Sequence, residues 1–336
     1  MKILVTGSAG FIGYNICKKL INRKNIVYGI DNFDNYYSVK YKNQRINDLK
    51  KNKNFIFHKI DITNLKQIKN YLKKFNFDII INLAAQAGVR YSYINPGKYI
   101  DTNIRGYLNL ILYSKKQKLK KIIYASSSSV YGDSINFPLK ENEKLSPKNI
   151  YGSSKMLNEK ISETYSKIYN IPFIGLRFFT IFGEWGRPDM FLFKLFKSYF
   201  NKDTFYLNNF GNHERDFTYI DDVTRSIELL INKAPSQNKK SNYKNDSLSS
   251  VAPYRIINIG NQKRVYLKNF INALEKKLDK KAKKNNMSMQ KGDVKKTLSN
   301  TNLLYQIIKY KSKVKYIDGI SRFINWYKKY YKLRFF

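Results

Sequence analysis

The sequence lacks the residues that hold many small secreted domains together. Its 336 residues include one cysteine, Cys17, and two histidines, His58 and His213. A single thiol cannot close an intramolecular disulfide, and one cysteine with two histidines cannot supply the four ligands of a structural zinc ion. We therefore exclude a disulfide framework and a structural zinc site, and we expect no bound metal. A chain of this length can bury a large core without either.

Long apolar runs are also missing. No run approaches the roughly 20 residues that a membrane span needs, and no basic and apolar leader precedes the opening Met-Lys-Ile-Leu-Val-Thr-Gly. We therefore expect a cytoplasmic protein that does not enter a membrane. Hydrophobic residues make up 43% of the chain, which is enough for a globular core and excludes a disordered chain.

Acidic residues are scarce. The chain has 24 Asp and Glu against 63 Lys and Arg, a net charge of +39, and such an excess is typical of proteins that bind polyanions. The lysines are nevertheless spread along the chain among Asn, Ile, Tyr and Phe, whose codons are rich in A and T, so the pattern also indicates codon bias. A basic surface suits a small anionic substrate equally well. Charge alone does not choose between these interpretations.

The first half of the chain alternates short β-branched runs with amphipathic stretches. Near-continuous apolar runs are typical of strands buried on both faces of a parallel sheet. The predicted strands are Lys2–Thr6, Ile26–Asp31, Phe55–Ile60, Asp78–Leu83, Lys121–Ser126 and Pro172–Phe178. The predicted helices between them are Ile12–Asn22, Leu65–Phe75, Ile104–Lys118 and Tyr151–Tyr169. This alternation predicts an α/β fold with a doubly wound, Rossmann-like parallel sheet.

The alternation ends near residue 180, where a second, smaller domain is expected to begin. A loop at 183–188 precedes an apolar segment at 190–200, and residues 219–231 and 255–259 predict a helix and a strand that return to the first domain. Two more helices are predicted at 267–280 and 317–331. We therefore assign residues 1–179 and about 216–262 to a dinucleotide-binding domain. Residues of about 180–215 and 263–336 are assigned to a substrate-binding domain.

A glycine-rich turn lies between the first predicted strand and the first predicted helix. Its sequence is Gly7-Ser-Ala-Gly10-Phe-Ile-Gly13. Glycines allow a tight turn and close approach of a pyrophosphate, while the following helix N-terminus supplies free N–H groups and positive potential. The spacing differs from the commoner Gly-x-Gly-x₂-Gly. The context predicts a dinucleotide site, with an ordinary Gly-rich turn as the alternative.

Two carboxylates lie at the ends of the second and third predicted strands. Asp31 follows the glycine-rich turn at close to the roughly 20-residue spacing at which an acid binds the adenosine ribose 2′-OH. Its carboxylate would repel a 2′-phosphate. It therefore favours NAD over NADP, unless it is only a residue of the turn that ends the strand. Asp61 and Ile62 are candidates for flanking the adenine, and Asp61 equally suits a helix N-cap.

A second group of candidates carries the chemistry. Tyr151 and Lys155 are four residues apart and share one helix face. A neighbouring cation favours the phenolate, so we expect the tyrosine pKa to fall from about 10 toward neutrality, as a general acid/base requires. Ser127 follows a predicted strand at the sheet edge where ligands bind. A surface Tyr–Lys pair is the alternative, and we expect His58 and His213 to be ordinary surface or strand residues.

Five motifs together resemble the extended short-chain dehydrogenase/reductase family, and within it the nucleotide-sugar epimerases. They are Gly7–Gly13, Asn82–Ala85, Ser126–Gly132, Tyr151–Lys155 and Arg215–Asp222. Four further segments are similar to the UDP-glucuronate 4-epimerase branch, namely Ala87–Ser92, Gly175–Met190, Ala252–Gly260 and Gly292–Val294. The resemblance covers nearly the whole chain. It departs at Lys291, where a proline is usual.

The resemblance implies an NAD-dependent conversion of UDP-glucuronate to UDP-galacturonate. A 4-keto intermediate would form by transient hydride transfer to tightly held NAD, with Tyr151, Lys155 and Ser127 as the catalytic residues. The implied cofactor contacts are Gly7, Ala9, Gly10, Phe11, Ile12, Gly13, Asp31, Asn32, Asp61, Ile62, Leu83, Ala84, Ala85, Asn103, Tyr151 and Lys155.

The resemblance also implies how the sugar is held. Related decarboxylases and dehydratases carry Ser-Glu or Asp-Glu before the Val-Tyr-Gly at 130–132, where this chain has Ser128-Ser129. The missing acid favours plain epimerisation over loss of CO₂ or water. The implied substrate contacts are Ser127, Ser128, Thr180 and Arg187 for the sugar and its carboxylate, Arg90 and Arg215 for the diphosphate or uronate, and Asp293 for the uridine ribose.

Structural alternatives remain for three of these side chains. Arg187 is otherwise a loop arginine without a ligand. Arg215 is otherwise paired with one of the nearby acids at 216, 221 and 222, and Asp293 is otherwise a loop acid. These alternatives assign each side chain to the fold and not to a substrate.

Other functions remain open at this stage. Within the same chemistry, the alternatives are a UDP-glucose/galactose 4-epimerase and a UDP-glucuronate C5 epimerase. From another class, the +39 charge suggests a non-catalytic Rossmann protein that binds a polyanion. The expected partner is a UDP-sugar and not a nucleic acid. By analogy with the family we expect a homodimer formed through the helices at 104–118 and 151–169.

Overall fold

The computed structural model describes residues 1–336 except 116–117, 202, 237–240, 242 and 333–336. Within these described residues, the largest sheet has seven strands in the order β10-β6-β5-β4-β1-β2-β3, all parallel. Its strands are β1 Lys2–Thr6, β2 Ile26–Asp31, β3 Phe55–Lys59, β4 Ile79–Asn82, β5 Lys121–Ser127, β6 Phe173–Phe178 and β10 Tyr254–Ile259. The predicted fold class is confirmed, and each strand boundary lies within one residue of its prediction.

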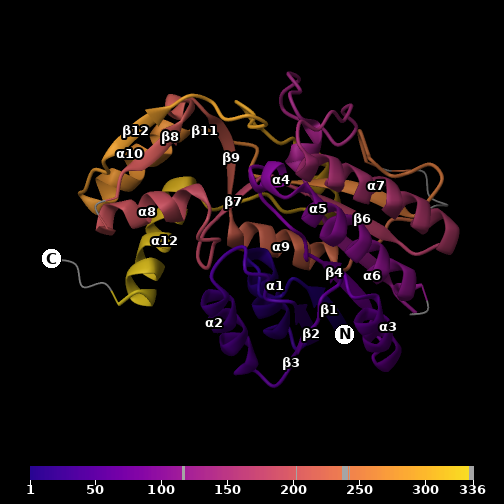
Figure 1. Ribbon diagram of the computed structural model, residues 1–336. Helices are drawn as coiled ribbons and strands as arrows, with labels where there is room; N and C mark the ends of the chain where they lie inside the picture. Colours follow the sequence, from indigo (N-terminus) through magenta and orange to yellow (C-terminus); the bar gives the residue numbers. More distant parts are fainter. Residues whose placement is uncertain (116–117, 202, 237–240, 242, 333–336) are drawn as a thin grey trace.

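Helices cover both faces of this sheet (Figure 1). The helices of this group are α1 Phe11–Ile21, α2 Val39–Lys50, α3 Leu65–Lys74, α4 Tyr91–Ile94, α5 Pro96–Tyr99, a π-helix at Ile100–Gly106, α6 Tyr107–Ser114, α7 Ile150–Tyr169 and, later in the chain, α9 Ile220–Leu230. Successive residues of β1 point to opposite faces, so Ile3 and Val5 join one buried cluster and Leu4 joins another. The apolar run of a doubly covered strand therefore fills two cores at once.

The rest of the chain forms a second group of elements, which Figure 1 shows to the left of the main sheet. Its strands are β7 Thr180–Phe182, β8 Phe205–Asn208, β9 Glu214–Tyr219, β11 Arg264–Tyr266 and β12 Lys284–Met287, which form the sheets β11-β9-β7 and β12-β8. Its helices are α8 Phe191–Asn201, α10 Leu267–Leu278 and α12 Tyr316–Tyr330, whereas α11 Asn302–Ile308 packs against β10 and α9 of the first group. Short 3₁₀ turns occur at Ser128–Tyr131 and Asn209–Gly211.

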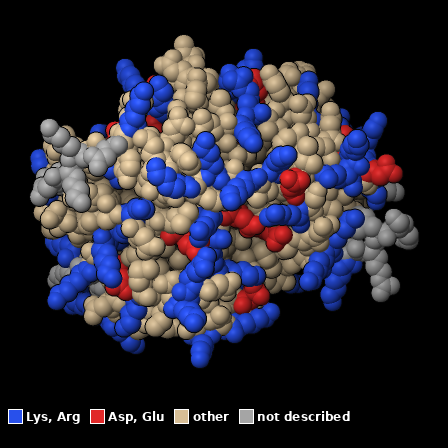
Figure 2. Space-filling view, turned by 180° about the vertical axis from the view of Figure 1, so that it is seen from behind, with Lys and Arg blue, Asp and Glu red and all other residues tan. Residues whose placement is uncertain are grey.

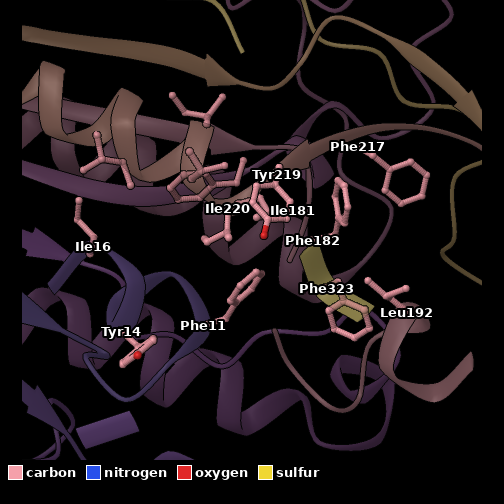
Figure 3. Packing of buried hydrophobic residues seen from close by; sticks show 14 of the residues in the cluster. Phe11, Tyr14, Ile16, Ile181, Phe182, Leu192, Phe217, Tyr219, Ile220 and Phe323 are labelled. Atoms are coloured by element: carbon pink, nitrogen blue, oxygen red, sulfur yellow. The ribbon is translucent and has the colours of Figure 1, made fainter. Parts of the chain in front are cut away.

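The two groups of elements share one hydrophobic core. Figure 3 shows Phe11 of α1 and Ile220 of α9 in the same cluster as Phe182 and Phe217 of the smaller sheet. Phe323 of α12 packs into that cluster as well. Burial of such aromatic side chains is worth about 1.5–3 kcal/mol each, so the core holds the second group firmly against the main sheet.

A buried ion pair fixes α7 against the ends of two central strands. Glu159 of α7 accepts from Arg177 of β6 through both of its oxygens, at 2.9 and 2.8 Å. It also accepts from the hydroxyl of Ser126 in β5. Glu159 lies four and eight residues after Lys155 and Tyr151 on the same helix, so this pair orients the helix face on which the predicted catalytic residues stand.

Glu141 lies beside this ion pair and makes stability depend on pH. Only 7% of it is exposed, and burial raises its pKa from 4.5 to about 7. The pKa of Glu141 is therefore higher in the folded state than in the unfolded state. Its contribution to the free energy of unfolding is fully present below pH 4.5 and is lost as the pH rises through 7. The free energy of unfolding should therefore lose about 3 kcal/mol from this group over that range.

We expect Glu141→Gln to remove this loss, because an amide does not titrate but still accepts from the backbone N–H of Asn258, as Glu141 does at 2.9 Å. Relative to wild type, the variant should gain stability between pH 5 and pH 8. Chemical denaturation at both pH values measures the difference. A wild-type-to-variant difference that is equal at the two pH values would contradict the assignment.

The surface charge is spread out on the face seen in Figure 2. Lys and Arg side chains lie over most of that face, with acidic residues among them. No single basic patch of the kind that follows a nucleic acid backbone stands out there among the described residues. The described part of the chain also contains no helix with the length and apolar character of a membrane span.

Candidate active site

A cleft of about 530 Å³ opens at the carboxyl ends of β1, β4, β5 and β6. The chain runs outward from β1 through β2 and β3 and then crosses back to β4 on the other side of β1. Ligands of doubly wound sheets bind at this point of reversal. The predicted site residues that line the cleft are Gly7, Gly10, Phe11, Ile12, Gly13, Asp31, Asn32, Ile62, Leu83, Ala84, Ala85, Ser127, Ser128, Tyr151, Lys155, Thr180, Arg187 and Asp293.

The glycine-rich turn has the geometry of a dinucleotide cradle. Gly7 has φ +68°, and a Cβ there would lie 2.7 Å from the backbone nitrogen of Ala84. A Cβ on Gly13 would lie 2.0 Å from the carbonyl oxygen of Gly7. The turn therefore brings β1, β4 and the start of α1 closer together than side chains would permit. The N-terminus of α1 faces the cleft, as binding of a pyrophosphate requires.

Asp31 and Asp61 both contribute to the local backbone. Asp31 accepts from the N–H of Ala9 at 3.1 Å and from the N–H of Phe33 at 2.9 Å, and burial raises its pKa. Its carboxylate thus supports the glycine-rich turn and also lines the cleft. Asp61 lies outside the cleft lining and accepts from the side-chain amide of Asn32 at 2.9 Å. Ala9 is fully buried within the turn.

Asn103 lies behind the cleft wall in the π-helix and does not line the cleft. Its side-chain oxygen accepts from the N–H of Gln86 at 2.8 Å, and its amide nitrogen donates to the carbonyl of Gln86 at 3.1 Å and to Ser154 at 2.9 Å. Gln86 itself lines the cleft. Asn103 therefore connects the loop after β4 to the helix that carries Tyr151.

The predicted catalytic residues meet at the start of α7 and the end of β5. Lys155 is 2% exposed, its Nζ donates to the carbonyl of Ala125 at 2.9 Å, and burial lowers its pKa to about 8. Tyr151 forms a hydrogen bond with Ser127 that lowers the pKa of the phenol, and the charge of Arg187 acts in the same direction. All three predicted catalytic side chains therefore face one cleft.

The predicted direction of the Tyr151 pKa was wrong for the polypeptide by itself. Burial outweighs the Ser127 hydrogen bond and the Arg187 charge, so the pKa of the phenol is raised above 10. The sequence showed the cation four residues away but not the desolvation of the phenol, which disfavours its charged form.

Arg187 reaches the same end of the cleft from the loop between β7 and α8. Its guanidinium donates to both carboxylate oxygens of Asp189, at 3.0 and 2.5 Å, and lies 5.6 Å from the centre of the Tyr36 ring. Thr180 and Ser128 line the cleft with it. The remaining N–H groups of a paired guanidinium can still bind an anion in the cleft.

Arg215 and Asp293 form an ion pair at 3.2 Å, so Arg215 does not take the partners at 216, 221 or 222 that the sequence suggested. Asp293 lines the cleft, whereas Arg215 lies behind it and Arg90 is exposed outside the lining. His213 joins this cluster, with Nε2 3.5 Å from a carboxylate oxygen of Asp293 and only 4% of the residue exposed. The prediction of an ordinary surface or strand histidine was wrong, because a contact across 80 residues of sequence is invisible locally.

Sequence reasoning missed several residues that line the cleft. They include Asp34, Tyr36, Tyr37, Lys42, Gln86 and Met190. Four of them lie between the end of β2 and the first turn of α2, a segment without an apolar periodicity. The acidic and aromatic residues that directly follow Asp31 in Asp-Asn-Phe-Asp-Asn-Tyr-Tyr could have indicated a loop at the ligand-binding edge.

Comparisons with known proteins agree with this geometry. The sequence pattern of the "NAD dependent epimerase/dehydratase family" matches residues 3–260. The chain belongs to this family. It is 44% identical to Protein CapI of Staphylococcus aureus over 99% of this chain and 100% of that protein. It is 36% identical to a UDP-glucuronate 4-epimerase of Thermodesulfobacterium geofontis, over 97% and 95% of the two chains.

A solved structure is similar over nearly the same length. It is the UDP-glucuronic acid 4-epimerase of Bacillus cereus in complex with UDP-glucuronic acid and NAD, with a TM-score of 0.88 and 32% identity over 98% of this chain and 100% of that one. The predicted membership of the extended dehydrogenase/reductase family, the nucleotide-sugar epimerase activity and the NAD dependence are confirmed. The glycine-rich turn fits that cofactor, since its backbone leaves no room for side chains where a pyrophosphate must approach.

Proposed function

We propose that this family member interconverts UDP-glucuronate and UDP-galacturonate at C4. The observation that supports this substrate is the position of Arg187, which shares one cleft with Thr180, Ser128 and the Tyr151 phenol. A cation beside hydroxyls suits a sugar carboxylate, whereas a neutral hexose would bring no negative charge to the N–H groups of Arg187 that Asp189 leaves free. Relatives named as UDP-glucuronate 4-epimerases add support.

In this proposal Tyr151 accepts the proton of the sugar C4 hydroxyl and later returns it. When bound, oxidised NAD supplies a hydride acceptor for C4 and a positively charged ring. Because burial raises the pKa of the phenol, the proton acceptor needs positive charge around it. Lys155 supplies part of that charge, since a pKa of about 8 leaves it protonated at pH 7. Ser127 donates to the C4 oxygen and shares the proton.

The sugar carboxylate can be lost as CO₂ during this reaction. A ketone at C4 makes the C5 carboxylate part of a β-keto acid, which loses CO₂ readily. We propose that Arg187, Thr180 and Ser128 hold the carboxylate and so oppose that loss. Ser128 and Ser129 offer hydroxyls where an acidic side chain would supply a proton donor or acceptor. In this proposal the hydroxyls can still form hydrogen bonds with the substrate but do not promote the loss of CO₂.

The other end of the substrate is assigned to the Asp293 cluster. We propose that Asp293, which lines the cleft, accepts from the uridine ribose, while Arg215 and Arg90 supply positive charge for the diphosphate. Desolvation of Asp293 is outweighed by the hydrogen bond with His213 and, after it, by the charges of Arg215 and Arg90, so the pKa of its carboxyl is lowered and it stays ionised. Residues 1–179 and about 216–262 would then bind NAD, and residues of about 180–215 and 263–336 would bind the nucleotide sugar.

We also propose that the protein is a homodimer formed through the π-helix with α6 and through α7. Exposed apolar side chains on these elements support this, including Ile100, Leu157 and Ile168, of which Ile168 is 62% exposed. A cytoplasmic location remains a prediction.

The test is incubation of the holoenzyme with each of three substrates, UDP-glucuronate, UDP-glucose and UDP-N-acetylglucosamine, with products identified by NMR. We expect UDP-galacturonate from the first and at least about tenfold lower kcat/KM with the other two. Preference for UDP-glucose would favour the hexose epimerase, and a product inverted at C5 would favour the C5 epimerase. No turnover, with affinity for a polyanion that falls steeply with salt, would favour the non-catalytic alternative.

A further inference from the structure

Arg45 of α2 is fully buried, and its hydrogen bonds run to oxygen atoms from three separate segments. Nη1 donates to the carbonyl of Ala9 at 2.7 Å and to the hydroxyl of Tyr37 at 2.8 Å. Nη2 donates to the carbonyl of Gly186 at 3.1 Å and also to the carbonyl of Trp185. The ring of Tyr41 lies 4.4 Å from the guanidinium carbon. One side chain thus binds the glycine-rich turn and the loop that carries Arg187.

This arrangement depends on the shape of the guanidinium group. Its planar fork directs several N–H groups along fixed directions, whereas a lysine ammonium is a compact charge that cannot reach both sets of carbonyls at once. Burying a charge is costly unless it is hydrogen-bonded, and the two Nη atoms of Arg45 meet that need, while its Nε has no hydrogen-bond partner among the described residues. A fully buried cation that binds these backbone carbonyls therefore fixes their positions strongly.

The loop that Arg45 binds is held in an unusual conformation. Trp185 has φ +57° and Gly183 has φ +139°, both in the left-handed half of backbone space. For a tryptophan this conformation is disfavoured and persists only where its surroundings enforce it. The Trp185 ring packs against Tyr14 and Tyr41, each at 5.3 Å between ring centres. The Arg45 hydrogen bonds and this aromatic packing both act directly before Arg187.

We propose that Arg45 is a positioning residue for Arg187, and through it for recognition of the sugar carboxylate. By fixing the carbonyls of Trp185 and Gly186, it sets the backbone direction directly before Arg187 and so the position of the Arg187 side chain. It also connects that loop to the glycine-rich turn assigned to the cofactor, so that the distance between the cofactor site and Arg187 is kept constant. The inference rests on the proposed function, because it assumes that Arg187 contacts a uronate.

The test compares binding of UDP-glucuronate and UDP in the NAD-loaded protein. Calorimetry in a Tyr151→Phe background measures both dissociation constants without turnover. Arg45→Lys should weaken UDP-glucuronate binding about tenfold while leaving UDP binding within about twofold. With Tyr151 present, the same change should raise KM for UDP-glucuronate more than it lowers kcat. NAD content is measured by extraction, so that cofactor loss is recognised.

A matched control separates positioning from stability. Arg255 is also buried and binds both carboxylate oxygens of Asp246, at 2.9 and 2.7 Å, away from the cleft lining. Arg255→Lys should lower the melting temperature but leave the ratio of the two dissociation constants unchanged. If Arg45→Lys does not yield folded protein, Arg45→Gln, which avoids an unpaired buried charge, is scored by the same ratio.

A double variant tests whether Arg45 acts through Arg187. In an Arg187→Met background, Arg45→Lys should change UDP-glucuronate affinity by less than about twofold, because the two changes act through one contact. Equal weakening of UDP and UDP-glucuronate by Arg45→Lys, or full additivity with Arg187→Met, would overturn the inference. Failure of the wild type to bind or convert UDP-glucuronate would instead overturn the proposed function. The effect of Arg45→Lys would then be judged from the dissociation constants of UDP and of the UDP-sugar that the protein does convert.

Discussion

Tyr151→Phe is expected to lower kcat for UDP-glucuronate by about 10²- to 10⁴-fold, the range for losing a general acid/base. The substitution removes only the phenolic oxygen, the atom that would accept and return the C4 proton. NAD should remain bound and the affinity for UDP-glucuronate should change little, since the ring itself still lines the cleft. Turnover is measured by NMR, NAD by extraction, and affinity by calorimetry.

Tyr206→Phe provides the control for this change. Tyr206 lies in β8, is 59% exposed and does not line the cleft, so the same loss of a hydroxyl should leave kcat unchanged. Turnover by Tyr151→Phe within about threefold of wild type would remove Tyr151 from the mechanism. Loss of NAD together with turnover would point to a role in cofactor retention instead.

Arg187→Met is expected to have the second largest effect, a fall of about 10²- to 10³-fold in kcat/KM for UDP-glucuronate. Truncating one partner of a desolvated charge pair costs several kcal/mol. The change also leaves Asp189, which Arg187 binds at 3.0 and 2.5 Å, facing a second carboxylate. UDP affinity should be unaffected because UDP lacks the uronate.

The double variant Arg187→Met with Asp189→Asn isolates the lost contact from the new repulsion. It should recover part of the activity but remain at least about tenfold below wild type. Steady-state kinetics with UDP-glucuronate and calorimetry with UDP provide the measurements. If Arg187→Met keeps wild-type kcat/KM, the assignment of the carboxylate site and the case for a uronate substrate both fail.

The sheet was predictable because its signal is local. In β1 and β2 the apolar runs Lys2–Thr6 and Ile26–Asp31 coincide with the observed strands, since a strand covered on both faces has no polar side. Helix α2 was missed because Lys42 and Arg45 occupy buried positions on it. A charged residue in the core interrupts the apolar period, and the tertiary contacts that satisfy it are not visible in the sequence.

The predicted site shows the same division. The glycine-rich turn and the Tyr151–Lys155 pair were predictable because their geometry is set within a few residues. The pairing of Arg215 with Asp293 joins positions 78 residues apart, and the bond from Arg45 to Gly186 spans 141. The raised pKa of Tyr151 likewise follows from burial by distant segments. Such properties depend on tertiary packing, which local patterns do not encode.

The central claim is that one hydrogen leaves C4 of UDP-glucuronate and returns to the same carbon within this cleft. The direct measurement uses UDP-glucuronate labelled with deuterium at C4, incubated with the holoenzyme in ordinary water. NMR and mass spectrometry of the product should show UDP-galacturonate that retains deuterium at C4. Product that has exchanged this label with water, or absence of UDP-galacturonate, would contradict the account.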